Sequence, residues 1–574
     1  MSDWLDNLWW DLTQHTVLFP YELAVLVFFL LLHAIPGFEW PFLTAAVHKF
    51  RRFANRRPLA IAAVFLFTLV GHFAAEPGYR TPPPGVHDEF SYLLAADTFA
   101  SGRLTNPPHP MRFFFESFHI LTEPTYMSMY PPGNGMMLAS GMLIANNPMA
   151  GVWLCAALAA AALCWMLQGW VTPSRALLAS LIFAIRVAWL SYWGNSYWGG
   201  ILSALGGALL LGAVPRLMKR PHWSYALALG SGMVILENTR LYEGTILNLA
   251  AAIWLLVWLI RNRRREIALW IAKAGVPLAA LLAVAIVWMG YYNWRITGNP
   301  LLLPYLLNRQ KFEMYGSFVW QDKHPGKHYD HEALRKFYVE SEGYRDKEGY
   351  LRIQLQKPQR LWFFFIGPAL TLAVIGAFGG WRSRRLQLAW ISILSLFAAH
   401  LLVPWNILPH YAGPITAPIY LLLIEGLRRL AAFRRHAALP GRLLSRASLA
   451  TVFFMLFFRI AAPSLGISVY QEFTLPWYSY GLHANFHRAN VESKLLSMGG
   501  EHLILVRYRP NHLPHQEWVY NKADIDAAPI VWARYVEDPS RLKILLDYYK
   551  NRKIWIISPD DNPTRIFEFK EHPQ

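Results

Sequence analysis

Two adjacent carboxylates, Asp88 and Glu89, stand in the stretch "PPPGVHDEFSYLLAADTFASGRL", shortly after an apolar run. Carboxylates accept protons from attacking hydroxyl or amine groups in general-base catalysis. Two like charges side by side can also raise the pKa of one of them, which suits a base. A solvated helix start without a function is the alternative, because a carboxylate outside a membrane is easily hydrated.

The residues after this pair have helical apolar spacing: Phe90, Leu93, Leu94 and Phe99 would share one side of a short helix. This spacing favours a helix that lies in the plane of a membrane interface. A helix in that position would hold the carboxylate at its start rigidly over a lipid head group.

Arginine side chains suit phosphate oxygens because their fork of donors can form two parallel hydrogen bonds. Four arginines fall in segments that we expect on the same side as Asp88, namely Arg103, Arg240, Arg295 and Arg309. The sharpest candidate is Arg240 in "LENTRLYEGTI", with Tyr242 and Glu243 beside it. Arg240 would either bind a phosphate or form a structural ion pair with Glu237 or Glu243.

The stretch "PHYAGP" places His410 and Tyr411 at the start of another predicted helix, where they would bind a phosphate or cap the helix. The C-terminal tail has His502, His512 and His515, whose spacing matches no familiar zinc motif, so we expect a solvated loop. The sequence therefore assigns no metal ligands.

The elements that must position these residues are membrane helices. The chain has 574 residues, 55% hydrophobic and only 16% charged, whereas soluble domains are about a quarter charged. Apolar segments recur at lengths that span a bilayer of about 30 Å. The first, near Tyr21, lacks the flanking features of a signal peptide, so we expect a retained span.

The net charge of +18 does not indicate nucleic-acid binding, because the basic residues fall in short loops at span-sized intervals. That placement is the positive-inside pattern, which puts these loops in the cytoplasm. The loops are Lys49 to Arg57, Arg216 to Arg220, Arg261 to Arg265, Arg382 to Arg385 and Arg428 to Arg446.

Threading the chain through these loops predicts about twelve transmembrane helices within residues 1–465, with both termini outside. The expected helices lie near residues 20–36, 58–75, 148–169, 177–193, 197–214, 222–238, 241–260, 268–291, 359–379, 387–403, 412–427 and 448–465. Long external loops are expected near residues 75–132 and 292–358. Loops of this length are often functional, although their aromatic residues would also suit a membrane-anchoring belt.

Residues 466–574 are expected to form a small extracytoplasmic α/β domain. The runs "HLILVRY", "PIVWA" and "KIWIIS" are typical of strands, and "DPSRLKILLDYYKN" has helical spacing after a capping residue. A strand–helix–strand unit implies at least one parallel pair.

The segment 86–138 resembles the first external loop of GT-C glycosyltransferases. The resemblance rests on Asp88-Glu89, Tyr92, Phe99 and Gly102, and on "MYPPGNGMML" (Met129 to Leu138) before the next helix. The nearest types are protein O-mannosyltransferases and lipid A aminoarabinose transferases. The sequence departs from the family pattern in two ways. The tail lacks the Trp-Trp-Asp signature of oligosaccharyltransferases, and the chain is expected to have one N-terminal helix more than the family has.

The resemblance implies an inverting transfer of a sugar from a polyprenyl-phosphate donor to an acceptor glycan, lipid or protein on the extracytoplasmic face. Asp88 would be the base, and Glu89 would support it or carry part of its role. The phosphate and sugar of the donor would be bound by the candidates named above, together with Tyr130 of "MYPPGNGMML". These residues are Arg103, Tyr130, Arg240, Tyr242, Glu243, His410 and Tyr411.

The resemblance also implies a multi-pass protein of a bacterial-type inner membrane, with membrane lipids and no nucleic acid as partners. It assigns no cofactor and leaves room for a divalent metal, because relatives differ in metal dependence. Two other classes stay open: a polytopic transporter or flippase, and a polymerase or ligase of lipid-linked glycans. A transporter would be expected to show internal repeats and discontinuous helices, and the sequence has no convincing repeat.

Overall fold

The computed structural model describes residues 18–35, 41–75, 82–341, 343, 346, 349–405, 408–433, 440–467, 482–561 and 564–569. The chain divides into two compact units, each built from three separate stretches of sequence. Unit 1 comprises Met1–Arg80, Val152–Ile286 and Tyr350–Trp477, and unit 2 comprises Thr81–Gly151, Val287–Gly349 and Tyr478–Gln574. Residues 1–17 and 570–574, which contain the two termini expected on the outer side, lie outside the described residues.

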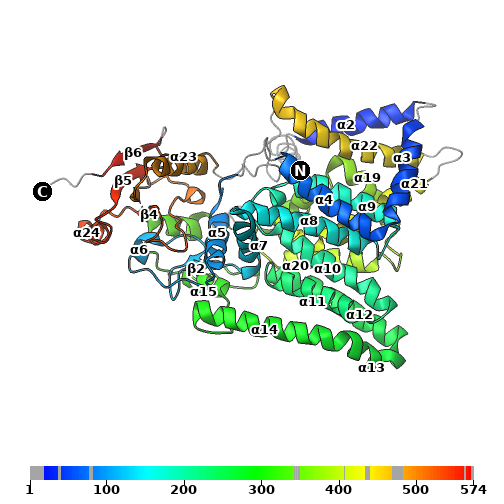
Figure 1. The fold of residues 1–574 in the computed structure, drawn as a ribbon, viewed down its shortest axis with the longest axis horizontal. Coiled ribbons are helices and arrows are strands. Elements are labelled where there is room, and N and C mark those ends of the chain that lie inside the picture. The colour runs from blue at the N-terminus through cyan, green and yellow to red at the C-terminus, as the bar shows by residue number, and fades with distance from the viewer. Residues whose placement is uncertain are drawn as a thin grey trace. The chain divides into compact units, whose positions relative to one another are not determined.

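Unit 1 is helical throughout its described residues (Figure 1). Helix α8 begins, and helix α14 ends, in the sequence of unit 2. The α-helices are α2 (Leu18–Ala34), α3 (Pro41–Ala54), α4 (Arg57–Ala75), α8 (Pro148–Leu167), α9 (Pro173–Phe183), α10 (Gly200–Lys219), α11 (Trp223–Glu237), α12 (Leu241–Asn262), α13 (Ile267–Trp270), α14 (Val276–Thr297), α18 (Tyr350–Phe365), α19 (Gly367–Phe378), α20 (Gln387–Leu401), α21 (Thr416–Ala432) and α22 (Pro440–Ala461). Short π and 3₁₀ turns join them: η1 (Ala184–Trp189), η2 (Tyr192–Gly194), η3 (Arg264–Glu266), η4 (Ile271–Gly275), η6 (Pro409–Ile415) and η7 (Ala462–Leu465).

Helices overlap all twelve ranges expected as spans, and the amphipathic α3 is an addition that the sequence analysis did not expect. Among the described residues, five helices are long and apolar enough to cross a membrane. The number rises to seven if each of two bent pairs, α3 with α4 and α18 with α19, is one span. The chain is thus a multi-pass membrane protein by length and composition, and the figure of about twelve stays a prediction.

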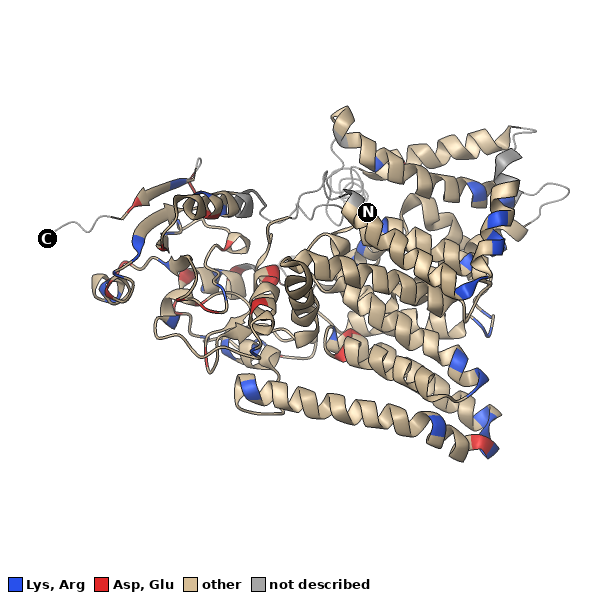
Figure 2. Ribbon diagram, viewed as in Figure 1, with Lys and Arg blue, Asp and Glu red and all other residues tan. Residues whose placement is uncertain are grey.

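The outward faces of unit 1 are apolar, as expected of helices that contact lipid. On α14, for example, Val284, Ile286 and Val287 are 68–72% exposed. Lys and Arg instead gather at one end of the bundle, where Figure 2 shows the blue segments at the ends of the helices. This arrangement follows the loop charges that the sequence shows, and it gives the bundle two unlike ends.

A buried ion pair identifies the partner of Arg186, which the sequence places inside a predicted span. Arg186 Nη1 lies 2.9 Å from Glu22 Oε1 on α2. Arg186 also donates to the carbonyl of Ile366, and Glu22 accepts from the backbone N–H of Ala369. Helices α18 and α19 meet here at 104°, so the run of helical backbone hydrogen bonds is interrupted at this point. The ion pair supplies hydrogen-bond partners for the carbonyl of Ile366 and the N–H of Ala369.

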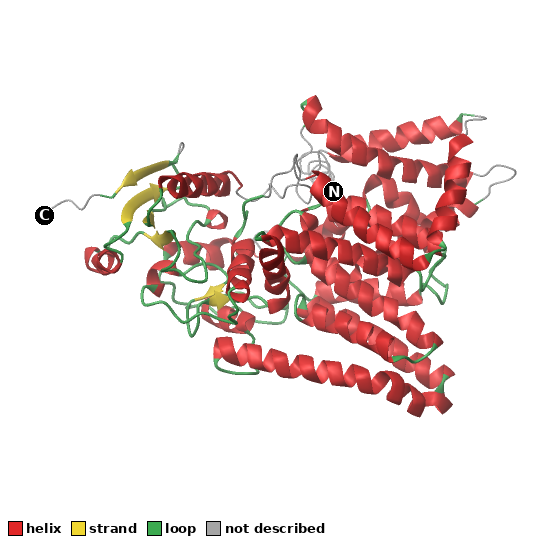
Figure 3. Ribbon diagram, in the orientation of Figure 1, coloured by secondary structure: helices red, strands yellow, loops and turns green. Residues whose placement is uncertain are grey.

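Unit 2 contains all the strands of the described residues (Figure 3). The C-terminal residues do not cluster alone; they form this unit with the two segments expected as external loops. The helical elements are α5 (His87–Ala100), α6 (Arg112–Phe115), α7 (Pro132–Ala145), α15 (Pro304–Phe312), α16 (Glu332–Arg335), η5 (Lys336–Ser341), α23 (Leu482–Met498), η8 (Pro514–Gln516) and α24 (Pro539–Tyr548). The strands are β1 (Ile120–Leu121), β2 (Met127–Ser128), β3 (His502–Val506), β4 (Ile530–Arg534), β5 (Lys553–Ser558) and β6 (Arg565–Glu568).

The C-terminal sheet has the order β4-β3-β5-β6. Strand β3 is parallel to both β4 and β5, which confirms the expected parallel pairing, and β6 adds an antiparallel edge. Both faces of β3 are buried, which explains its unbroken apolar run. Leu503 and Leu505 pack on the face that contacts α24, whereas Ile504 and Val506 pack with Leu495 of α23.

Helix α5 does not lie on a surface, so the prediction of an interfacial helix is wrong. Phe90 and Leu94 belong to the same buried cluster as Leu503 and Leu505 of the sheet. The Phe90 ring stacks on Tyr520 with a centroid distance of 4.2 Å. The apolar spacing is real, but the apolar side of the helix packs against protein rather than lipid.

Candidate functional site

The start of α5 fixes the two carboxylates in different environments. The extended backbone of Val86 precedes the helix, and both acids fall in its first turn, where the helix dipole favours negative charge. Glu89 is 3% exposed and accepts a hydrogen bond of 2.6 Å from the backbone N–H of Gly85. Asp88 points elsewhere, and its side chain retains 25% exposure. Glu89 thus braces the turn that presents Asp88.

A hairpin places two more groups beside Asp88. Ser91, one turn along α5, donates to the carbonyl of His119 and lies 2.7 Å from Ser128 Oγ. These contacts attach the β1–β2 hairpin to the helix. The hydroxyl of Tyr130, just past the hairpin, donates to Asp88 Oδ1. The His119 ring lies 4.5 Å from the His87 ring, with its backbone in the left-handed region at φ 59°.

The other two segments of unit 2 complete the cluster. His515 comes from η8, in the connection between β3 and β4, and its Nδ1 lies 3.2 Å from His87 Nε2. Phe337 of η5 contacts His87, His119 and His515 with ring centroids 4.8–5.6 Å apart. Residues far apart in sequence therefore surround one carboxylate. We call His87, Asp88, His119, Tyr130 and His515 the Asp88 cluster.

The Asp88 cluster keeps its carboxylate ionised. Burial opposes ionisation of Asp88, but His87, His119 and the Tyr130 hydroxyl outweigh it, so the pKa lies far below its ordinary value. The expectation that Glu89 raises this pKa is wrong, because Glu89 turns towards Gly85. Burial, helped by His87, lowers the pKa of His119 to about 3 and that of His515 to about 4, so both imidazoles are neutral at pH 7.

The residues of the Asp88 cluster fit a divalent metal. His87, Asp88 and His119 offer ligand atoms that all lie within 4.8 Å of one another. His119 Nδ1 is buried and makes no hydrogen bond to a described residue, whereas His87 Nδ1 lies 3.0 Å from Asp88 Oδ2. A neutral imidazole at His119 and an ionised carboxylate at Asp88 are protonation states that metal binding requires. The sequence analysis named no metal ligand here because these residues are not spaced as a local motif.

A second polar group, in unit 1, is built around Arg240. Arg240 directly precedes α12, and its guanidinium carbon lies 4.5 Å from the centroid of the Tyr411 ring. Tyr411 stacks on His410, and Nδ1 of His410 lies 2.8 Å from the Tyr192 hydroxyl. The 3₁₀ helix η6 holds both residues against α10, where a Cβ at Gly207 would lie only 2.1 Å from the Pro414 carbonyl oxygen.

The carboxylates near Arg240 have other partners. Glu237 accepts hydrogen bonds from Thr245 and Asn248, at 3.1 and 2.8 Å. Glu243 Oε1 lies 3.6 Å from Nε2 of His400, which is 2% exposed. The Tyr242 hydroxyl donates to the Ala399 carbonyl at 2.8 Å, which ties α12 to α20. These contacts do not favour the structural ion pair that the sequence left open for Arg240. We call Arg240, Tyr242, Glu243, His400, His410 and Tyr411 the Arg240 cluster.

The structure brings the expected site residues into these two clusters except for Arg103 and for Glu89, which bonds to Gly85 beside Asp88. Asp88 and Tyr130 meet in unit 2, and Arg240, Tyr242, Glu243, His410 and Tyr411 gather in unit 1. Arg103 follows the other end of α5, about 20 Å from Asp88 at about 1.5 Å per residue, so the two cannot share a small ligand. His87, His119 and Phe337 were missed, and His515 was noticed without a role.

The three tail histidines are not solvated as expected. His502 and His512 are 0% and 5% exposed, and His512 pairs with Asp560 at 2.7 Å. Two features of the sequence could have pointed to the Asp88 cluster. His87 is adjacent to Asp88, and His119 precedes the segment that leads to the "PP" motif.

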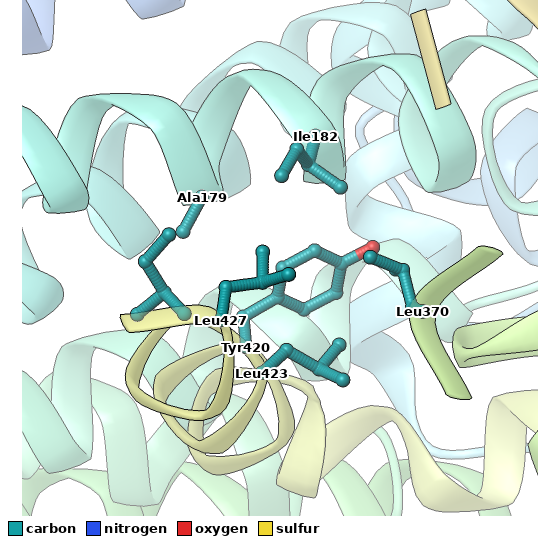
Figure 4. Close-up of a pocket in the computed structure, with 7 residues that line it drawn as sticks. Ala179, Ile182, Leu370, Tyr420, Leu423 and Leu427 are labelled. Carbon is teal, nitrogen blue, oxygen red and sulfur yellow. The ribbon is translucent and has the colours of Figure 1, made fainter. Parts of the chain in front are cut away.

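A pocket in unit 1, between α9, α19 and α21, is unlike either cluster (Figure 4). It is lined by Ala179, Ile182, Leu370, Tyr420, Leu423, Ile424 and Leu427. Apart from the Tyr420 hydroxyl the lining is apolar, so this pocket offers no group for proton transfer or phosphate binding.

No known family model matches the sequence, and no curated protein matches it. Solved structures do match, each over 87% of this chain. The oligosaccharyltransferase of Archaeoglobus fulgidus, tethered with an acceptor peptide, is 10% identical, with 69% of its chain covered and a TM-score of 0.43. ArnT from Cupriavidus metallidurans in the apo state is 13% identical, with 92% covered and a TM-score of 0.42.

A further structure, archaeal AglB from Archaeoglobus fulgidus with an inhibitory peptide and a dolichol-phosphate, is 10% identical, with 69% covered and a TM-score of 0.38. At these scores the matches assign no residue of this chain a role. Over 87% of its length, the chain is thus similar to the solved structures of an archaeal oligosaccharyltransferase and of ArnT.

Proposed function

We propose that the protein transfers a sugar from a polyprenyl-phosphate donor to an acceptor on the extracytoplasmic face of the membrane, with inversion. The observation that carries this proposal is the Asp88 carboxylate, which is ionised, oriented by Tyr130 and still 25% exposed. The acceptor oxygen or nitrogen forms a bond to the anomeric carbon as the bond from that carbon to the phosphate oxygen breaks. The electron pair leaves with the lipid phosphate, and Asp88 takes the acceptor proton.

A weak base is sufficient for this reaction. Positive charge develops on the sugar ring as the leaving group departs, as in glycoside hydrolysis, and this charge acidifies the attacking acceptor. Asp88 therefore needs to be ionised and correctly aimed more than it needs a high pKa. Tyr130 holds Oδ1, and Glu89 braces the turn through Gly85, which together restrict the directions that the carboxylate can take.

The leaving phosphate requires cations, and Arg240 is the residue that we propose for it. The face of Tyr411 supports the guanidinium, and the arginine fork matches phosphate oxygens. Tyr242, Glu243 and His410 fix the helix ends around it through contacts with Ala399, His400 and Tyr192. Their proposed part is to hold Arg240 and Tyr411 in place rather than to react.

A transporter or flippase of lipid-linked sugars is the second candidate, and one observation favours it. Unit 1 contains two helix pairs bent by more than 100°, and the break between α18 and α19 is held by the buried Arg186–Glu22 pair. Broken helices with buried charges are typical of secondary transporters. A transporter would not need the Asp88 carboxylate in unit 2 for proton transfer.

Substituting Asp88 separates the two functions. Asp88→Asn keeps the shape of the side chain but cannot accept the proton, so sugar transfer should fall by about 10²–10⁴-fold. Binding of the polyprenyl-linked donor and its movement across proteoliposome membranes should not change. Glu89→Gln should have a smaller effect, because the amide oxygen can still accept from Gly85.

Normal sugar transfer by Asp88→Asn would exclude the base. If Asp88→Asn instead stopped lipid-linked sugar movement while no transfer were detected in the wild type, the transporter would be the better assignment.

A further inference from the structure

We propose that His87, Asp88 and His119 bind a transition-metal ion of the Zn²⁺ class, and that His515 orients His87 for this task. The proposal goes beyond sugar transfer, which in the form given above requires only a carboxylate. It concerns a site made of two imidazoles and one carboxylate, with a fourth side chain behind one imidazole.

The distances suit a shared ion. His87 Nδ1 lies 3.0 Å from Asp88 Oδ2. The two atoms therefore already face each other, and a metal ion would take the place of this direct contact. Ligands at about 2.0–2.2 Å from a tetrahedral zinc lie about 3.3 Å apart. The His87–Asp88 pair is already near that spacing, and the His119 ligand atom, within 4.8 Å, needs only a side-chain adjustment.

The burial of the nitrogen atoms also points to a ligand. His119 is 9% exposed, and its Nδ1 has no hydrogen-bond partner among the described residues. A buried polar atom left without a partner is unfavourable. Most of the surrounding wall is aromatic, because Phe337 contacts both imidazoles and Phe118 contacts His87. A metal ion would satisfy both nitrogens and the carboxylate at once.

The donor set selects the class of metal. Imidazole nitrogens favour Zn²⁺ and its transition-metal neighbours, whereas Mg²⁺ and Ca²⁺ prefer sites made of oxygen atoms. Three protein ligands also leave one position of a tetrahedral site open. An ion bound here would act as a Lewis acid towards an oxygen atom in that position.

His515 has the geometry of an orienting partner. With a metal ion bound at Nδ1 of His87, the proton of this imidazole would lie on Nε2, which is 3.2 Å from His515 Nδ1. Metal-bound histidines commonly donate their second N–H in this way, which fixes the tautomer and the ring plane. Because η8 carries His515, the C-terminal sheet would help to shape a site whose ligands belong to the first segment of unit 2.

The test uses the full chain in detergent, purified with a tag that contains no histidine and stripped of metal with a chelator. Zn²⁺ and Co²⁺ are then added, the excess is removed, and the metal content per chain is measured by mass spectrometry. We expect one Zn²⁺ per chain, and visible absorption bands of a four- or five-coordinate site with Co²⁺. His119→Ala and His87→Ala should remove both signals.

Two variants give the proposal its specificity. His515→Phe should keep the Co²⁺ spectrum and weaken the affinity by about 10–100-fold, as expected for an orienting partner. His328→Ala is the matched control, because His328 is 87% exposed and lies outside the Asp88 cluster, and it should bind metal as the wild type does. His119→Gln replaces His119→Ala if the alanine variant does not fold.

X-ray absorption of the Zn²⁺-loaded wild type does not depend on any variant. Two imidazole ligands and an oxygen ligand are expected, and a shell of oxygen atoms alone would overturn the proposal. Equal Zn²⁺ content in the wild type and the His87→Ala/His119→Ala double variant would also overturn it. These readouts require no turnover, so the metal site can fail while Asp88 remains the base, and the reverse outcome is equally visible.

Discussion

The two polar clusters of this protein are assembled over very different sequence distances. The core of the Arg240 cluster comes from two short motifs, "LENTRLYEG" and "PHYAGP", and each motif lies at the end of a helix in unit 1. The Asp88 cluster in unit 2 instead draws on two of its three segments, with His87 and His515 more than 400 positions apart.

This difference shows how each region creates a polar site. In unit 1 polar sites form at the ends of helices, because backbone groups there lack helical partners and side chains such as Tyr242 and Arg186 donate to them. In unit 2 the polar site depends on a packed core, because α5 and the C-terminal sheet bury a common set of apolar residues. The polar residues at the edge of that core are then held close together.

The largest expected effect concerns membrane topology, that is, the side of the membrane on which the loops of each unit lie. Reporter fusions at Arg263 and Arg384, in basic loops of unit 1, should give a cytoplasmic signal. Fusions at Gly326 and Lys522, both in unit 2, should give an external signal, because the positive-inside rule puts the basic loops in the cytoplasm. Each fusion gives an all-or-none result, measured with paired enzyme reporters that are active on opposite sides of the membrane.

An external signal at either arginine loop would break the proposed threading and leave the side of Asp88 undefined. A cytoplasmic signal at Lys522 alone would separate the C-terminal segment from the expected external loops, against their grouping in unit 2.

The sequence predicted the local features well. Helices overlap all twelve expected ranges, and the three expected strands and the expected helix of the tail lie within a few residues of their positions, although α23 and β6 were not expected. Hydropathy and strand propensity are properties of short windows, so a short window is enough to detect them. The "PP" motif behaved in the same way, because Pro132 opens α7 as its position suggested.

Features that depend on packing were not predictable. The apolar side of α5 has the same spacing whether it faces lipid or protein, and only the tertiary fold decides between them. His119 and His515 have no common spacing with Asp88, so no motif search could have joined them. Arg186 was found as a charge in a predicted span, but its partner Glu22 lies 164 positions away.

A smaller effect tests the Arg240 cluster. Arg240→Lys replaces a two-pronged donor with a point charge, which should weaken the binding of polyprenyl phosphate by about 10–100-fold. Binding is measured on the purified protein, and the unfolding temperature is measured on the same sample. Arg295→Lys is the matched control, because Arg295 lies over Tyr291 at 5.9 Å and outside the cluster.

If Arg240 serves only to hold helices together, the result is reversed. The unfolding temperature of Arg240→Lys would then fall while its affinity for polyprenyl phosphate stayed at the wild-type value. A fall in both would show that the cluster binds the lipid and also stabilises the bundle.

The smallest effect concerns the ring beneath Arg240. A cation over an aromatic face contributes about 0.5–2 kcal/mol, which corresponds to a change of about 2- to 30-fold in affinity. Tyr411→Leu removes that face, so the guanidinium should lose its fixed position and polyprenyl phosphate should bind more weakly by this factor. Tyr411→Phe keeps the face and should bind the lipid almost as the wild type does.

The pair of Tyr411 variants separates the ring from the hydroxyl. Equal losses in Tyr411→Leu and Tyr411→Phe would mean that the hydroxyl matters and that the contact of 4.5 Å with Arg240 does not. Tyr411 also stacks on His410, so a fall in unfolding temperature in Tyr411→Leu alone is expected and is not evidence against the proposal. What counts is the affinity at a temperature where both variants are folded. If Tyr411→Leu binds polyprenyl phosphate normally there, Arg240 does not depend on its ring, and the two motifs of unit 1 act separately.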